Sequence, residues 1–374
     1  MSKENKTYFI SGGGTGGHIY PAVAVVKNLL NQPDTGKIYF VGNPKNMEYD
    51  IVKNIEKVEF LPVNVSGMPR KFSLNFLGWL CRLEIALWKV LYYILKYKPD
   101  VVFTTGGYVS APAAFMAGML KKPLMIHDCD SVPGLVSKAA APFANVVSVA
   151  FESAKNVLKS DNILVLGNPV RTESASVSKE EAREKLGLKQ GKFTILITGG
   201  SQGAKTLNDA AVYAAQHIVE RMDSQLIIQT GRKKYDEVIK QFDEYFPHHA
   251  ENTNLLIKPY FDDMFVPLKA ADVAVSRAGS LTLSELNLCG LPCILVPYPH
   301  AAADHQRKNA MEAEKAGYAL WCDDFDFDGE KFIEMIYKIT SDNNKLTKMC
   351  EASVANAKPQ ATEVIVENLK SLVK

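Results

Sequence analysis

Short apolar runs alternate with longer segments of helical periodicity along most of this chain. Each run has the length of one buried strand, and several end at glycine or proline. Strands that alternate with helices form parallel sheets covered on both faces. The predicted strands lie at residues 8–10, 37–41, 58–63, 101–104, 124–127 and 146–150 in the first half, and at 193–197, 225–229, 254–257, 272–275 and 293–296 in the second. The pattern therefore predicts an α/β protein with two parallel sheets.

A break at residues 166–171, with the sequence Leu-Gly-Asn-Pro-Val-Arg, separates the two halves. The polar stretch that follows ends in Ser178-Lys179-Glu180-Glu181, which has the spacing of a helix capping box. We therefore expect one domain over residues 1–168 and a second over residues 169–354. A final helix, at about residues 361–372, follows the second sheet and could pack on either domain.

A glycine-rich loop follows the first strand of each half, at residues 11–18 and 198–203. Such a loop, with the helix after it, directs backbone N–H groups and a positive helix end toward anions. Two such loops suggest a cleft between the domains that holds the diphosphates of a donor and an acceptor. The first loop also matches the dinucleotide-binding spacing Gly12-x-Gly14-x-x-Gly17. However, the second strand ends in Gly42-Asn43 rather than in a ribose-binding acid, which disfavours a dinucleotide-dependent dehydrogenase.

The composition agrees with a two-domain globular protein. A chain of 374 residues exceeds the size of one ordinary hydrophobic core. The net charge of +2 gives no overall attraction to nucleic acid, so we expect no nucleic acid partner. The six cysteines form no CxxC pair, which is typical of isolated reduced thiols. The N-terminal residues run straight into a strand without the apolar stretch of a secretion signal, and the chain has no apolar run of the roughly eighteen residues needed to span a membrane.

His18 lies where the first glycine-rich loop meets its helix. A neutral imidazole there can accept a proton from a hydroxyl group, and the positive helix end favours the neutral form. This makes His18 a candidate general base, with a helix cap as the alternative. Two acidic pairs, Asp128 with Asp130 and Asp324 with Asp326, could hold a divalent cation on a sugar diphosphate, although such pairs are also common on protein surfaces.

Three polar residues of the second half suit a nucleotide sugar. Glu285 lies one turn into the helix after the strand at 272–275, where its carboxylate can accept a hydrogen bond from each of the two ribose hydroxyls. The alternative is a glutamate that only favours the helix dipole. Gln306 and Asn309 are three residues apart on a predicted helix, and their amides suit a ligand rich in hydroxyl groups. Here the alternative is a polar, solvent-facing side of the helix.

Five motifs follow one another along nearly the whole chain. They are Gly13–His18, Thr105–Ser110, Asn168–Arg171, Gly199–Ala204 and Arg277–Glu285. In this order they resemble the motifs of the MurG family, the N-acetylglucosaminyltransferases that convert lipid I to lipid II in bacterial peptidoglycan synthesis. The resemblance implies an inverting hexosyltransferase with a glycosyltransferase B fold, in which two Rossmann-like domains with parallel sheets face a cleft. It also implies that the C-terminal segment 355–374 packs back on the first domain.

The resemblance further implies where the donor, UDP-N-acetylglucosamine, binds. The second domain holds most of the donor, and the first glycine-rich loop closes on it. The implied donor-binding residues are Arg171 and Ser201 at the diphosphate, Phe261 at the uracil through its backbone, Ser280, Leu281, Thr282, Leu283, Ser284 and Glu285 around phosphate and ribose, Gln306 and Asn309 at the sugar, and Thr15, Gly16 and Gly17 from the first domain.

The chain departs from the family at residues 127–130. It has His127-Asp128-Cys129-Asp130 where the family commonly has His-Glu-Gln-Asn. The acid at the second position is kept with a shorter side chain. At the fourth position the carboxylate of Asp130 replaces an amide implied to bind the donor or acceptor sugar, and we retain Asp130 among the candidate donor-binding residues.

The implied reaction is a single displacement at the anomeric carbon of UDP-N-acetylglucosamine by the muramyl 4-hydroxyl of lipid I, the undecaprenyl-diphosphate-linked muramyl peptide. His18 is the first candidate for the base and Asp128 the second. The helix after Gly203, with Ser201 and Arg171, would stabilise the leaving UDP, so we expect no metal ion and no cofactor. The alternatives are a UDP-sugar transferase acting on another lipid acceptor, such as diacylglycerol, and a non-catalytic UDP-sugar sensor at the membrane.

Residues 70–98 interleave apolar and aromatic residues with six cations and a single acid. A helix of this composition suits an anionic bilayer surface, while its frequent charges prevent it from spanning the bilayer. We therefore expect a peripheral protein on the cytoplasmic face of the cell membrane, with Phe76, Leu77 and Trp79 inserted into the leaflet. The alternative is an ordinary amphipathic helix that covers the sheet.

Overall fold

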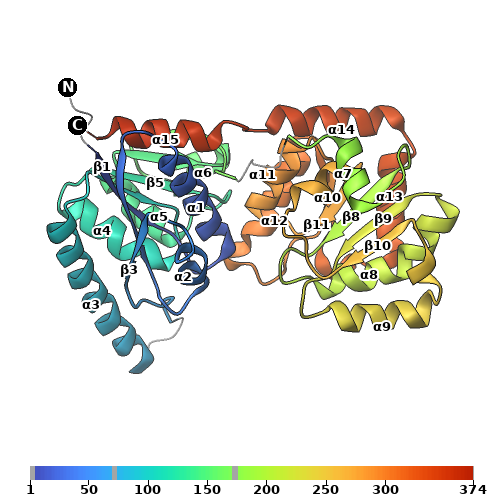
Figure 1. Cartoon of the computed structure of the whole chain (residues 1–374), viewed down its shortest axis with the longest axis horizontal. Coiled ribbons are helices and arrows are strands. Elements are labelled where there is room, and N and C mark those ends of the chain that lie inside the picture. Colours follow the sequence, from blue (N-terminus) through green and yellow to red (C-terminus); the bar gives the residue numbers. More distant parts are fainter. Residues whose placement is uncertain (1–4, 70–73, 171–175, 374) are drawn as a thin grey trace. The chain divides into compact units, whose positions relative to one another are not determined.

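The computed structural model describes residues 5–69, 74–170 and 176–373 of the chain (Figure 1). The chain forms two compact units. One contains residues 1–170 and 359–374, and the other contains residues 171–358. Each unit has one parallel sheet with helices packed against it, which confirms the predicted α/β class and the two sheets.

The sheet of the first unit has seven parallel strands in the order β3-β2-β1-β4-β5-β6-β7. The strands are β1 (Lys6–Ser11), β2 (Thr35–Gly42), β3 (Val58–Pro62), β4 (Val101–Thr104), β5 (Leu124–Asp128), β6 (Val146–Val149) and β7 (Ile163–Val165). The apolar pattern predicted the first six. The edge strand β7 has only three residues, all half-buried, and its sequence does not distinguish it from a loop.

Alternate residues of β1 serve opposite faces of this sheet, as the period of a strand requires. Phe9 packs in the core beneath α3 (Leu74–Tyr97) and α4 (Ala111–Met119), whereas Tyr8 and Ile10 pack in the core beneath α1 (Gly16–Leu30) and α15 (Ala361–Ser371). Figure 1 shows α15 beside α1 in this unit. The helices are α1 (Gly16–Leu30), α2 (Met47–Val52), α3 (Leu74–Tyr97), α4 (Ala111–Met119), α5 (Leu135–Ala140), α6 (Glu152–Lys155) and α15 (Ala361–Ser371), with 3-10 turns η1 (Tyr108–Ser110) and η2 (Ala141–Phe143).

The sheet of the second unit has six parallel strands in the order β10-β9-β8-β11-β12-β13. The strands are β8 (Thr194–Thr198), β9 (Gln225–Gln229), β10 (Leu255–Lys258), β11 (Val273–Ser276), β12 (Cys293–Leu295) and β13 (Ala319–Trp321). The pattern predicted all of these but β13, again a three-residue edge strand. The chain leaves this unit at residue 358, after α14 (Asn343–Asn356), and α15 then joins the core of the first unit.

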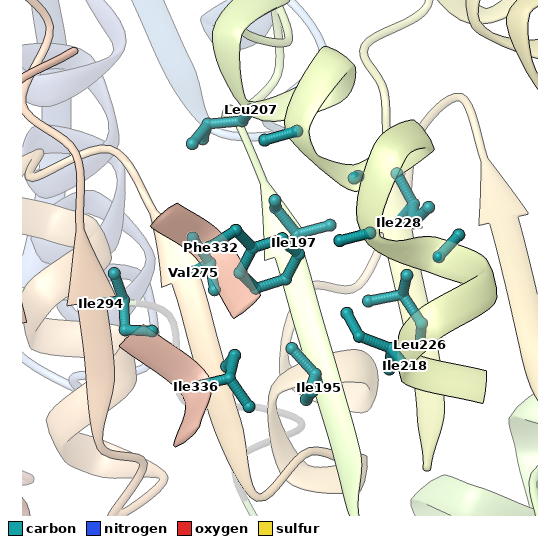
Figure 2. Packing of buried hydrophobic residues seen from close by; sticks show 14 of the residues in the cluster. Ile195, Ile197, Leu207, Ile218, Leu226, Ile228, Val275, Ile294, Phe332 and Ile336 are labelled. Carbon is teal, nitrogen blue, oxygen red and sulfur yellow. The ribbon is translucent and has the colours of Figure 1, made fainter. Parts of the chain in front are cut away.

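Helices cover both faces of the second sheet. Figure 2 shows Phe332 and Ile336 of α13 (Gly329–Thr340) packed against side chains of the central strands, among them Ile197 and Val275. The helices are α7 (Lys179–Leu186), α8 (Lys205–Gln216), α9 (Tyr235–Tyr245), α10 (Phe265–Ala270), α11 (Ser280–Leu288), α12 (His305–Lys315), α13 (Gly329–Thr340) and α14 (Asn343–Asn356), with the short turns η3 (His217–Arg221), η4 (His249–Glu251), η5 (Ala302–Asp304) and η6 (Asp324–Asp326). The predicted capping box at Ser178 and Glu181 is confirmed by both reciprocal hydrogen bonds.

Both sheets reverse their strand order beside their first strand, between β1 and β4 in one unit and between β8 and β11 in the other. In open parallel sheets, ligands bind outside the carboxyl ends of the strands at such a switch point. The two glycine-rich loops lie at these places, between β1 and α1 and between β8 and α8. These two strand ends are therefore the candidate ligand-binding positions of the two units.

Candidate active site

In the first unit, His18 lies in the first turn of α1, and its side chain is half-buried. Its Nδ1 is 2.9 Å from the carbonyl oxygen of Thr105, the residue that follows β4. A carbonyl oxygen only accepts hydrogen bonds, so in the neutral ring Nδ1 carries the hydrogen and Nε2 carries the lone pair. The ring is thus held by the next loop rather than by the end of its own helix, where Thr15 occupies the N-cap position. This geometry leaves Nε2 as the proton acceptor.

Two glycines let the loop after β4 approach His18 closely. Gly106 and Gly107 both have positive φ, 84° and 76°. A Cβ atom at Gly106 would lie 3.2 Å from His18 Nδ1, and one at Gly107 would overlap the carbonyl oxygen of Gly13. Only glycine meets both the backbone conformation and the close approach. The Thr105–Ser110 motif therefore shapes the surroundings of the histidine.

Asp128, the second candidate base, ends β5 and is only 3% exposed. Its carboxylate accepts hydrogen bonds from the backbone N–H groups of Gly134, at 3.0 Å, and Asp130, at 3.2 Å. Burial raises the pKa of the Asp128 carboxyl, and the hydrogen bond from Gly134 opposes this rise. A group so enclosed is better placed to act on its neighbours than to take a proton from a substrate directly. Asp130 itself is half-buried.

His127 occupies a fully buried position behind these residues. Its Nε2 is 3.0 Å from Asn168 Oδ1, and its Nδ1 is 3.0 Å from Ser148 Oγ. Burial lowers the pKa of His127 to about 4. This histidine is therefore a neutral structural link between β5, β6 and the Asn-Pro-Val-Arg motif. Arg171, the last residue of that motif and a predicted diphosphate ligand, lies outside the described residues.

In the second unit, the loop after β8 exposes Ser201 to solvent. Gln229, the last residue of β9, connects the end of β8 with the backbone at Phe261. Its Nε2 donates to Thr198 Oγ1 at 3.0 Å, and its Oε1 accepts the backbone N–H of Phe261 at 2.9 Å. The N–H of Phe261 is thus engaged inside the protein. Nothing in the sequence pattern distinguishes Gln229 from the other strand residues.

Arg277, which follows β11, is held from several sides. Its Nη1 donates to the carbonyl oxygens of Val296 and Pro297, at 3.0 and 3.2 Å, and it pairs with Asp324. Thr206, in the first turn of α8, donates to the same carboxylate at 3.1 Å. Asp324 thus binds a cation of the protein itself. Within the parts of the chain that the structure describes, no three His, Cys, Asp or Glu side chains gather as metal ligands would.

The predicted residues of α11 and α12 differ in exposure. Ser280 and Leu283 are buried, whereas Leu281, Thr282, Ser284 and Glu285 are half-buried. On α12, Gln306 Oε1 accepts the backbone N–H of Tyr298 at 3.0 Å, and this side chain is half-buried. Asn309 is fully buried, and its amide donates to the carbonyl oxygen of Ala278 at 3.1 Å. In this structure Asn309 therefore supports the loop before α11, and its direct contact with a sugar stays a prediction.

Each of the two units matches a known protein family. The chain matches the glycosyltransferase family 28 N-terminal domain over residues 8–149 and the glycosyltransferase family 28 C-terminal domain over residues 194–365. It is 34% identical over 367 residues to the UDP-N-acetylglucosamine--N-acetylmuramyl-(pentapeptide) pyrophosphoryl-undecaprenol N-acetylglucosamine transferase of Halothermothrix orenii, covering 97% of this chain and 98% of that protein. It is 37% identical over 359 residues to the protein of the same name from Desulfitobacterium hafniense, covering 96% of each.

A solved structure agrees with the sequence relatives. The crystal structure of MurG from Acinetobacter baumannii matches with a TM-score of 0.76 at 26% identity, covering 98% of this chain and 99% of that one. This chain belongs to the MurG family. As in the solved MurG-family structure, its two α/β units have the glycosyltransferase B fold.

The departure from the MurG-family pattern lies directly against His18. Cys129 is buried, its thiol donates to the carbonyl oxygen of Gly17 at 3.0 Å, and its Sγ is 3.6 Å from His18 Nδ1. Burial raises the pKa of the Cys129 thiol well above its usual range, so the group is neutral. The thiol therefore forms part of the wall against which the imidazole packs, a role that its position in the sequence does not reveal.

The predicted membrane residues of this MurG-family chain lie on α3. Leu77 is 59% exposed, but Phe76 and Trp79 are half-buried. Their rings are 5.5 Å apart, and Trp79 Nε1 donates to the carbonyl oxygen of Ser66 at 2.9 Å. The exposed large apolar residues of the helix are Leu77, Leu80, Ile85, Trp88, Tyr92 and Leu95, which recur every three to five residues and form one stripe. Among the helices of the described ranges, none is long and apolar enough to cross a membrane.

Proposed function

We propose that this chain transfers N-acetylglucosamine from UDP-N-acetylglucosamine to the muramyl 4-hydroxyl of lipid I, the undecaprenyl-diphosphate-linked muramyl peptide. The chain is a hexosyltransferase of glycosyltransferase family 28. The observation that carries the mechanistic proposal is the position of His18, whose Nδ1 is bound to Thr105 so that Nε2 is the proton acceptor. Relatives that share nearly the full length of the chain are named for this transfer.

The proposed reaction is one displacement that inverts the anomeric carbon. The muramyl 4-oxygen forms the new bond to the anomeric carbon as the bond between that carbon and the diphosphate oxygen breaks. The hydroxyl proton passes to His18 Nε2, and UDP leaves with the electron pair. Asp128 is the second candidate for the base, but its burial at 3% exposure favours an electrostatic role on the histidine.

The donor is proposed to bind the second unit. The N-terminus of α8 and the exposed Ser201 suit a diphosphate, and Arg171 is expected to add a positive charge. The carbonyl oxygen of Phe261 is proposed to accept a hydrogen bond from the N–H of uracil, while the backbone N–H of Phe261 is held by Gln229. Glu285 is proposed to bind the ribose hydroxyls. These groups supply the stabilisation of the leaving UDP, so we expect catalysis without a metal ion.

The acceptor side of the first unit has further proposed contacts. Thr15, Gly16 and Gly17, at the start of α1, are proposed to close on the donor, and Asp130 to contact a sugar hydroxyl. Thr15 is exposed, and the other three residues are half-buried, so all of them are open to a ligand.

We also propose that the protein acts as a peripheral protein on the cytoplasmic face of the cell membrane. The apolar stripe on α3 is flanked by the exposed cations Arg82, Lys89 and Lys96. An amphipathic helix with this arrangement binds anionic lipid surfaces. Such binding would bring the active site to a lipid-linked acceptor.

A UDP-release assay tests the function. The protein is incubated with a panel of nucleotide sugars, with and without a lipid I analogue, and parallel samples contain diacylglycerol or EDTA. We expect release with UDP-N-acetylglucosamine that depends on the lipid I analogue and persists in EDTA. Release with diacylglycerol instead would favour the other lipid transferase, and binding without any release would favour a sensor. Loss of activity in EDTA that one divalent ion restores would overturn the metal-independent mechanism.

A further inference from the structure

Glu48 is a fully buried glutamate that the reaction described above does not use. It is the second residue of α2 and lies just after the carboxyl end of β2. Its partners among the described residues are three N–H donors rather than a cation. A buried carboxylate is costly unless such donors compensate it, so the burial of Glu48 depends on these three hydrogen bonds.

The three donors come from two loops. Glu48 Oε1 accepts the backbone N–H of Asn43 and the side-chain Nδ2 of Asn46, both at 3.2 Å. Glu48 Oε2 accepts the backbone N–H of Gly14 at 3.3 Å. A Cβ atom at Gly13 would lie 2.7 Å from the carboxyl carbon, so the carboxylate sits directly against the first glycine-rich loop.

A third loop joins the same arrangement. Asn46 Nδ2 is also 3.1 Å from the hydroxyl oxygen of Tyr108, in the turn after β4. The Tyr108 ring lies against Gly14, where a Cβ atom would be 2.9 Å from Cε1. Glu48 therefore sits at the junction of the loops after β1, β2 and β4, the strand ends that surround His18.

A glycine-rich loop between a strand and a helix normally offers its N–H groups to an external anion. In this chain the N–H of Gly14 already binds an anion that the protein supplies. We propose that Glu48 is a positioning residue that fixes Gly13 and Gly14, and through them the start of α1 with His18, and that keeps phosphate groups away from this part of the loop. An anionic ligand then has only the α1 end of the loop available.

The substitution Glu48→Gln tests this role at one atom. An amide has one acceptor oxygen, so if that oxygen serves Asn43 and Asn46, the NH₂ group faces the N–H of Gly14. We expect faster hydrogen exchange at the Gly14 amide, with a melting temperature within a few degrees of the parent protein. We expect kcat to fall on the order of ten- to a hundredfold through misplacement of His18, with UDP affinity unchanged.

Two controls accompany this variant. Glu56→Gln changes an exposed glutamate of the same unit and should leave exchange at Gly14 and kcat unaltered. In Glu48→Ala, formate is expected to restore part of kcat, because its two oxygens can replace the lost carboxylate, whereas formate should not affect the parent protein.

The kinetic part of this test rests on the proposed transferase activity, but exchange at Gly14 does not. An inactive parent protein would refute the proposed function and leave the exchange measurement to decide the role of Glu48. Unchanged exchange and kcat in Glu48→Gln would overturn the proposal. So would a loss of kcat accompanied by an equal loss of UDP affinity and global unfolding.

Discussion

His18 and Thr105 are joined by two hydrogen bonds that run in opposite directions. The imidazole Nδ1–H donates to the carbonyl oxygen of Thr105 at 2.9 Å, and the Thr105 hydroxyl donates to the carbonyl oxygen of His18 at 2.6 Å. The first bond fixes the tautomer, and the second ties the backbone of α1 to the end of β4. Together they hold the candidate base from both its ring and its main chain.

His18→Ala is expected to lower kcat by about 10²–10⁴, the usual contribution of a general base, while UDP affinity stays nearly intact. Steady-state kinetics and a calorimetric titration with UDP measure the two quantities. His248→Ala, which changes an exposed histidine of the second unit, should leave kcat unaltered. Turnover at the parent rate in His18→Ala would show that Asp128 or another group takes the proton.

Glu285→Ala is expected to weaken UDP binding by about 1.5–3 kcal/mol, or roughly ten- to a hundredfold, because a charged acceptor bonded to ribose hydroxyls is lost. Calorimetry gives the dissociation constant. Glu351→Ala, at an exposed position on α14, serves as the matched control. Equal affinities in both variants would remove Glu285 from the ribose site.

Gly107→Ala and Gly78→Ala should have opposite effects on stability. At Gly107 the positive φ of 76° and the overlap with Gly13 are expected to cost about 1–3 kcal/mol of unfolding free energy, with a loss of kcat. Gly78 lies within α3, where the nearest atom to a new Cβ is 3.6 Å away, so alanine should stabilise the protein by about 0.5–1 kcal/mol. Urea unfolding of the two variants measures both changes in the free energy of unfolding, which we expect to have opposite signs. A neutral Gly107→Ala would show that the two loops can separate without cost.

The burial of His127 makes stability depend on pH. Its pKa falls from 6.5 to about 4 on folding, so between these pH values the unfolded chain binds a proton that the folded chain does not. This contribution to stability is therefore complete above pH 6.5 and is lost as the pH falls toward 4. A shift of this size corresponds to roughly 3 kcal/mol.

Urea unfolding at pH 7.5 and pH 5 tests this dependence. We expect the loss of stability at pH 5 to be smaller in His127→Gln than in the parent protein by roughly 2 kcal/mol. The raised pKa of Asp128 acts with the opposite sign, but both proteins keep Asp128, so the comparison cancels its effect. His248→Gln, at an exposed site, should follow the parent protein. Identical pH dependence in all three would exclude His127 as the source.

The membrane proposal is tested by two variants of α3. Replacing Leu77, Ile85 and Trp88 by Gln should reduce sedimentation with anionic vesicles and activity on a long-chain lipid acceptor, while sparing activity on a soluble short-chain analogue. Replacing Phe76 and Trp79 by Ser should lower the melting temperature, because these rings are half-buried and Trp79 is bonded to Ser66. Equal loss on both acceptors in the first variant would place the membrane contact elsewhere.

Local apolar runs predict eleven of the strands, because a parallel strand buried on both faces consists almost entirely of apolar residues. The two that were not predicted, β7 and β13, have three residues each and lie at sheet edges, where the apolar signal is weakest. The position of each glycine-rich loop, directly after a predicted strand in the sequence, also predicts that it lies at a strand end. These features depend on neighbours in sequence.

The features that could not be predicted from the sequence depend on contacts between residues that are not neighbours in the chain. Glu48 lies in a short polar-looking helix, and only the fold reveals that Gly14 and Asn43 enclose its carboxylate. Asn309 has the spacing of a polar helix face, yet it is fully buried against Ala278. Trp79 has the composition of a membrane anchor, but Ser66, thirteen residues away, accepts its indole hydrogen. In each case the environment of the side chain is determined by a contact partner that the pattern of apolar and polar residues does not identify.

The position of α15 has a consequence for how the protein forms on the ribosome. Ile365, Val366 and Leu369 share one core with Tyr8 and Ile10, and Lys370 pairs with Asp34 at 2.7 Å. Strand β1 therefore lacks part of its hydrophobic cover until α15 has been synthesised, which happens only after the whole second unit. The second unit is contiguous in sequence and can complete its core earlier, so of the two units the one whose sheet is translated first finishes folding last.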